Sequence, residues 1–165
     1  MKKAVWSAIV AVAVLIVAAP ASAQNTDTKT VNVTVNVSAR AKLTLSASTL
    51  TFADADPDTT PSIAAGAINV DAKVRTSPGG ASSLTVLADD DLTSGTDTIA
   101  ISNLTWTASG GGYAAGTMDA TTAQTLGSFS GPGNHSGAQT YALANSWSYA
   151  TGSYTATITY TLTAP

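Results

Sequence analysis

The residues just before the C-terminus constrain the fold most, because ten of them alternate without a break. Over residues 154–163, tyrosine, alanine, isoleucine or leucine occupies every even position and threonine occupies every odd one. Successive side chains of a β-strand point to opposite faces of a sheet, so this segment predicts a strand with one apolar and one hydroxyl-bearing face. Threonine and tyrosine also favour the extended backbone. We therefore expect a sheet with one buried face.

The N-terminus has the layout of a secretory signal peptide. Lys2 and Lys3 precede an apolar run over residues 4–18, and small residues follow as far as Ala23. The alternative is an uncleaved anchor, but the run is shorter than the roughly 20 residues that span a bilayer. We expect cleavage after Ala23, export to the cell surface, the periplasm or the medium, and no membrane span in the mature form.

The composition after Ala23 limits the possible chemistry. These residues include five Lys and Arg, ten Asp, no Glu, no Cys and one His. Thiol catalysis, thiolate metal sites and disulfides are therefore excluded. Without a basic stripe, nucleic acids and anionic membranes are disfavoured as partners. His135 lies in a segment rich in Gly, Pro, Asn and Ser, which predicts a surface loop. No nucleophile-elbow pattern is present, so we predict no catalytic residue and no enzyme.

Short alternating segments separated by turn signals run through the rest of the chain. Apolar residues alternate over residues 31–37, 68–74, 83–88 and 98–108, and the last of these segments changes parity near Asn103, which predicts a kink. No segment has helical spacing. We expect an all-β fold, an immunoglobulin-like antiparallel β-sandwich. The predicted organisation is a signal peptide (1–23), a polar N-terminal segment (24–30) and one sandwich domain (31–165).

Two acidic segments are candidates for metal binding. The weaker is the run Asp89-Asp90-Asp91, because adjacent carboxylates seldom converge on one ion. Asp54, Asp56 and Asp58 place carboxylates at alternate positions, a spacing that calcium loops use to converge hard oxygen ligands on one ion. The loop lacks the turn glycine and the final glutamate of an EF-hand, and a solvated acidic loop is the alternative. No other cofactor is expected.

Two aromatic residues near the C-terminus are candidates for sugar stacking. Trp147 and Tyr149 share one strand parity, and Tyr149 lies near a turn, so one of the rings is expected at the surface. Aromatic planes stack on the apolar faces of sugars, and this predicts a polysaccharide as a partner. A place in the core is instead expected for Trp106, which lies in the middle of a predicted strand.

The outline of the chain resembles bacterial fimbrial subunits and spore-coat U-type domains. The resemblance lies in the signal peptide, the alternating N-terminal segment and the closing run Gly-Ser-Tyr-Thr-Ala-Thr-Ile-Thr-Tyr-Thr over residues 152–161. In those families a Gly-x-Tyr leads into a final alternating strand. Many of their members carry a disulfide, which this chain lacks.

The fimbrial resemblance implies assembly by strand donation, in which an extended segment of one subunit fills a groove in the next. The apolar residues that would enter the groove are Val31, Val33, Val35 and Val37. The alternative is that they form the first strand of their own sandwich. We therefore expect a secreted bacterial structural or surface-assembly protein, namely a pilus, filament or coat subunit, that associates with itself or with other surface subunits. A cell-surface carbohydrate-binding domain is the second hypothesis.

Overall fold

The computed structural model describes residues 24–165, so the predicted signal peptide lies outside the described residues. The compact unit of the chain is Asn36–Pro165. Its regular structure is almost entirely antiparallel strand, with a single 3₁₀ turn, η1 (Ile101–Asn103), at the kink predicted near Asn103. This confirms the predicted all-β antiparallel sandwich.

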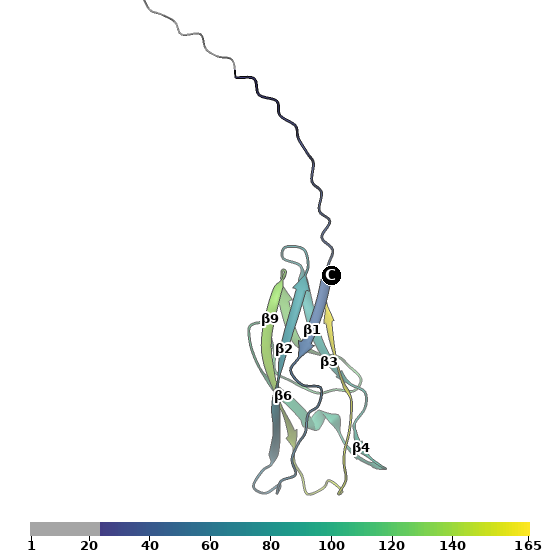
Figure 1. Cartoon of the computed structure of the whole chain (residues 1–165). Coiled ribbons are helices and arrows are strands. Elements are labelled where there is room, and N and C mark those ends of the chain that lie inside the picture. The colour runs from purple at the N-terminus through teal and green to yellow at the C-terminus, as the bar shows by residue number, and fades with distance from the viewer. Residues whose placement is uncertain (1–23) are drawn as a thin grey trace, which may run out of the picture. The chain divides into compact units, whose positions relative to one another are not determined.

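Two sheets make up the sandwich (Figure 1). The larger sheet has the order β1-β2-β9-β6-β7, and its strands are β1 (Arg40–Leu45), β2 (Ser62–Arg75), β9 (Gly133–Ala144), β6 (Leu104–Ser109) and β7 (Gly116–Thr117). The smaller sheet has the order β10-β3-β8, with β10 (Ile158–Thr163), β3 (Ala81–Ala88) and β8 (Gln124–Ser130). A separate hairpin joins β4 (Leu92–Ser94) to β5 (Asp97–Ile99).

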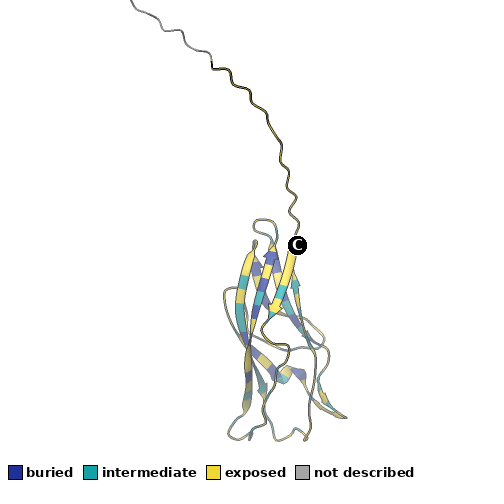
Figure 2. Cartoon of the chain, in the orientation of Figure 1, coloured by how far each residue is buried: buried dark blue, intermediate teal, exposed yellow. Residues whose placement is uncertain are grey.

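The core lies between the inward faces of the two sheets. Burial alternates along β2 and β3, as a strand with one covered face requires (Figure 2). The largest fully buried side chains come from both sheets and from the segment between β7 and β8: Tyr141, Leu84, Leu104, Met118, Leu126, Gln139, Val70 and Val86.

One side of the sandwich is closed by main-chain hydrogen bonds. The segment between β6 and β8 pairs with both of them: Ala114 N donates to Leu126 O at 2.9 Å, and Met118 N donates to Leu104 O at 2.8 Å. Ser128 N also donates to Gly112 O at 2.8 Å. Gly112 is required there, because its φ is +85° and a Cβ atom would lie 2.6 Å from the carbonyl oxygen of Ser128. The segment between β6 and β8 therefore bridges the two sheets on this side.

The opposite side of the sandwich is open. β1 and β10 lie beside each other in the compact unit, β10 being the yellow strand in Figure 1. Each has a hydrogen-bonded strand on one side only, β2 for β1 and β3 for β10, and the two do not pair with each other. We call the two unpaired edges of β1 and β10 the seam.

The predicted C-terminal strand is present but shorter. β10 begins at Ile158, and within residues 154–157 only Thr155 makes a bridge, to Thr93. The parity is as predicted: Ile158, Tyr160 and Leu162 are half-buried, and the threonines between them are exposed.

The prediction of a surface loop around His135 is wrong. β9 begins at Gly133, and His135 pairs with Ala72 inside the larger sheet. Its ring stacks on Phe129 with centroids 4.4 Å apart. Gly137 is glycine because the Tyr113 ring fills the place of a side chain, and a Cβ atom would lie 2.5 Å from it. Gly137, which reads as a turn residue in the sequence, is therefore explained by close packing over a strand.

Candidate functional site

A groove of about 1520 Å³, lined by both apolar and polar side chains, continues the seam into the other half of the sandwich. Leu45 at the end of β1 and Ile158 at the start of β10 both line the groove, so the groove begins where the two edge strands face each other. Further apolar lining comes from the residues after β1 and from β9 and β10: Leu50, Phe52, Leu143 and Tyr160. Leu50 and Phe52 belong to no strand, yet they pack against the core.

The apolar side chains along the seam are only partly covered. Leu43 and Leu45 of β1, and Ile158 and Leu162 of β10, pack against the buried core but are themselves half-buried. Their counterparts on the central strands, such as Val70 and Leu84, have no exposed surface. The sandwich therefore has an incomplete apolar layer along the seam and the groove, with room for more apolar side chains.

The predicted N-terminal valines are all at the surface. Val31, Val33, Val35 and Val37 are 85%, 83%, 76% and 66% exposed, and residues 24–39 contain no strand. The segment therefore does not form the first strand of its own sandwich, since that strand is β1 and begins at Arg40. Alternation over seven residues predicts an extended segment with an apolar face. It does not indicate whether the partner lies in the same chain.

The structure does not assemble the predicted calcium site. The carboxylate of Asp56 accepts a hydrogen bond from the Asp58 backbone N–H at 2.9 Å, which stabilises the turn. The carboxylate of Asp58 accepts one from Trp147 Nε1 at 3.0 Å. Within residues 24–165, no three His, Cys, Asp or Glu side chains are grouped to hold a metal ion. Two of the three carboxylates thus hold the loop.

The two predicted sugar-stacking residues border the groove. Trp147 is 70% exposed. Tyr149 is half-buried, and its hydroxyl donates to the carbonyl of Ala144 at 3.1 Å. Trp147 is therefore the ring available at the surface, and its contact with Asp58 links the residues before β2 to those after β9.

Asp89 fixes one wall of the groove. Its carboxylate accepts a hydrogen bond from the Thr157 backbone N–H at 2.7 Å, and its own N–H donates to the carbonyl of Thr157 at 2.9 Å. The Thr157 N–H lowers the pKa of Asp89 below its ordinary value. Thr157 directly precedes β10 and lines the groove. In the sequence this aspartate appears only as part of an acidic run.

The comparisons with known proteins add no identification. No family model matches the chain, and no curated protein matches it in sequence. No helix within residues 24–165 is long and apolar enough to cross a membrane.

Proposed function

We propose that the protein is a secreted, non-catalytic bacterial structural subunit of a pilus, filament or coat, and that its copies join by strand donation. Residues 31–37 of one copy lie along the seam and groove of the next copy. The observation that carries this proposal is a pair of complementary features in one chain: four exposed, alternating valines, and two unpaired strand edges with half-buried apolar side chains that lead into a groove. Secretion rests on the predicted signal peptide.

The chemistry of the segment suits an unpaired edge. In an extended conformation Val31, Val33, Val35 and Val37 face one side, and the residues between them, Asn or Thr, face the other. The valines then cover the half-buried apolar layer, and the polar side chains face water. The main chain of the segment bonds to the unpaired edge of β1 or of β10, which is the mode of binding known as β-strand addition.

The length of the valine segment also agrees with the lengths of β1 and β10. Seven extended residues span about 23 Å at roughly 3.3 Å per residue. β1 and β10 have six residues each, so the segment is long enough to pair along either edge. Complete burial of one valine side chain contributes about 1.5 kcal/mol or more, and four valines together offset part of the entropy lost on association.

The test uses two substitutions in the same segment that differ only in the face they change. Val33→Asp places a charge on the face that enters the groove, whereas Thr34→Asp places it on the face toward water. We expect the mature wild-type chain and Thr34→Asp to form polymers visible by negative-stain electron microscopy. Val33→Asp stays monomeric in sedimentation, with an unchanged circular dichroism spectrum. Polymers of equal length from both variants would refute the proposal.

A second candidate function is carbohydrate binding, favoured by the exposed Trp147 ring at the rim of the groove. Retention on a polysaccharide column, lost in Trp147→Ala with folding intact, would support it. Asp58→Ala is the matched control, because it removes the hydrogen bond to Trp147 but keeps the ring.

A further inference from the structure

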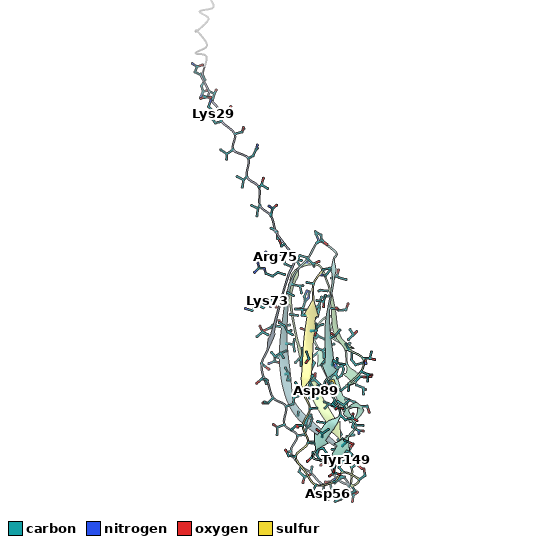
Figure 3. The ribbon with its side chains drawn as sticks, turned by 90° about the vertical axis from the view of Figure 1, so that its right-hand side faces the viewer. Lys29, Asp56, Lys73, Arg75, Asp89 and Tyr149 are labelled. Atoms are coloured by element: carbon teal, nitrogen blue, oxygen red, sulfur yellow. The ribbon has the colours of Figure 1, made fainter. Side chains whose placement is uncertain are left out.

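All the lysines and arginines of the compact unit lie on the outer face of two neighbouring strands. They are Arg40 and Lys42 on β1 and Lys73 and Arg75 on β2. The register places Arg40 opposite Arg75 and Lys42 opposite Lys73, and all four are exposed. Figure 3 shows Lys73 and Arg75 near each other at one end of the sandwich. We call these four residues the basic cluster.

The fold gives no stabilising reason for this arrangement. Like charges directly opposite each other on neighbouring strands are destabilising. Within residues 24–165 the one ion pair joins Lys29 to Asp27, outside the compact unit, so no member of the basic cluster has a carboxylate within ion-pair distance there. The nearest acid in the register is Asp71, opposite Thr44, and its carboxylate accepts a hydrogen bond from Ser136 Oγ.

The opposite end of the sandwich is acidic. Asp54, Asp56 and Asp58 are exposed, and we call them the acidic loop. Figure 3 places Asp56 at the end away from Lys73 and Arg75. Asp54 and Asp56 also border the groove. The basic cluster and the acidic loop thus lie at opposite ends of the sandwich and carry opposite charges.

We propose that the basic cluster of one copy docks against the acidic loop of the next, and that this contact sets the direction of strand donation. The inference rests on the proposed function. In the sequence only Ser38 and Ala39 separate Val37 from Arg40. The basic cluster of the donor therefore lies close to the point where its donated segment leaves the groove of the acceptor. The acidic loop of a second copy is complementary in charge to the basic cluster, so a second copy is the partner that we propose.

Charge favours one of the two possible directions. If Val37 leaves the groove beside the acidic loop, opposite charges meet. If it leaves at the other end, the basic cluster of the donor faces the basic cluster of the acceptor. β1 runs from its Arg40 end toward the groove, and β10 runs from the groove in the opposite direction. The favoured donated segment is therefore antiparallel to β10 and parallel to β1.

The first test exchanges the charges. One variant reverses the basic cluster (R40E, K42E, K73E and R75E). The other carries Asp54→Lys and Asp58→Lys and keeps Asp56, which accepts a hydrogen bond in the turn. We expect each variant alone to polymerise at least about tenfold more slowly than wild type at low salt, because charge steering is lost. A mixture of the two restores the rate, since opposite charges again meet at every junction.

The controls separate this inference from strand donation. Circular dichroism and thermal unfolding establish that each variant folds. Val33→Asp tests donation alone and is expected to prevent polymers at every salt concentration. If both charge variants polymerise as fast as wild type at low salt while Val33→Asp does not, docking is refuted and donation stands. If the basic-cluster variant polymerises normally but no longer binds immobilised polyphosphate, the cluster serves an anionic polymer and docking is again refuted.

The second test determines the direction of the donated segment by disulfide crosslinking. The sequence contains no cysteine, so each introduced cysteine is the only one in its copy. Copies carrying Asn36→Cys are mixed with copies carrying Thr59→Cys, in the turn that follows Asp58, or Ser77→Cys, in the turn after β2. A disulfide needs Cα atoms within about 7 Å, so it reports close neighbours. We expect crosslinks to the Thr59→Cys copies. Crosslinks to the Ser77→Cys copies alone would overturn the inference.

Discussion

Tyr160 on β10 and Tyr141 on β9 share a hydrogen bond of 2.6 Å between their hydroxyl groups. The bond crosses the core and ties an edge strand of the smaller sheet to a central strand of the larger one. Tyr141 is fully buried, and burial raises the pKa of both tyrosines above the ordinary value. Both rings are therefore protonated at neutral pH, and one hydroxyl donates to the other.

Tyr160→Phe is expected to lower the free energy of unfolding by about 1–3 kcal/mol, because the buried hydroxyl of Tyr141 loses its partner. Urea denaturation followed by circular dichroism measures the change. Tyr154→Phe is the matched control, since the hydroxyl of Tyr154 donates to the Ala150 carbonyl at an exposed site. Equal losses in the two variants would contradict the role given to the cross-core bond.

Alkaline pH is expected to destabilise the fold. Burial raises the pKa of Tyr113 to about 12, with a smaller contribution from the charge of Asp71, and burial also raises the pKa of Tyr141 and Tyr160. The unfolded chain loses these protons near pH 10, whereas the folded chain keeps them, so the unfolded state binds fewer protons. Stability is therefore fully present below about pH 10 and declines as the pH rises toward about 12 and beyond.

Urea titrations at several pH values, with tyrosinate absorbance as a second signal, check this alkaline decline. Tyr113→Phe is expected to make it shallower. A flat stability between pH 9 and pH 12 would contradict the assignment of protonated, buried tyrosines.

Gln139→Met is expected to raise the free energy of unfolding by about 1–3 kcal/mol. Gln139 has no exposed surface, and neither its amide oxygen nor its amide nitrogen has a hydrogen-bond partner among the described residues. Methionine has a similar length and carries no amide, so it removes the cost of burying one. Gln124→Met is the control, because the amide of Gln124 donates to Thr122 at an exposed site. A destabilised Gln139→Met would show that this amide supports the core.

Asp89→Ala is expected to make the residues just before β10, which line the groove, more mobile. The variant removes the carboxylate that accepts the Thr157 N–H, so hydrogen exchange should accelerate at residues 155–158 more than in β2. The pKa of Asp89 is lower in the folded chain than its ordinary value of 3.8. The carboxylate therefore contributes to stability at pH values above 3.8, and this contribution is lost as the pH falls through the folded pKa. Asp90→Ala is the control, and equal acceleration in both would contradict the assignment.

The sequence predicts the faces of strands well and their partners poorly. The alternation that ends the chain identifies the inward residues of β10, because side-chain direction depends only on local geometry. The same kind of alternation at residues 31–37 belongs to no strand of the compact unit. Strand membership depends on which edges remain unpaired, and that is a property of the whole sheet.

Close packing hides other features from the sequence. Gly137 of β9 resembles a turn residue until the position of Tyr113 is known. Arg40 and Arg75 lie far apart in the chain, and only the register of β1 with β2 makes them neighbours. The acidic loop is evident as a pattern, but its hydrogen bonds to Trp147 and to its own backbone depend on loop geometry.

The difference between the two sides of the sandwich has a consequence for growth. The side made by β6, β7 and β8 is linked by main-chain hydrogen bonds, whereas β1 and β10 do not pair with each other. If copies join by the proposed strand donation, the seam accepts one segment from a neighbour and residues 31–37 are given to another, so growth would follow one line without branching. The two tips of such a line are chemically distinct: one presents an unfilled acceptor and the other a free valine segment.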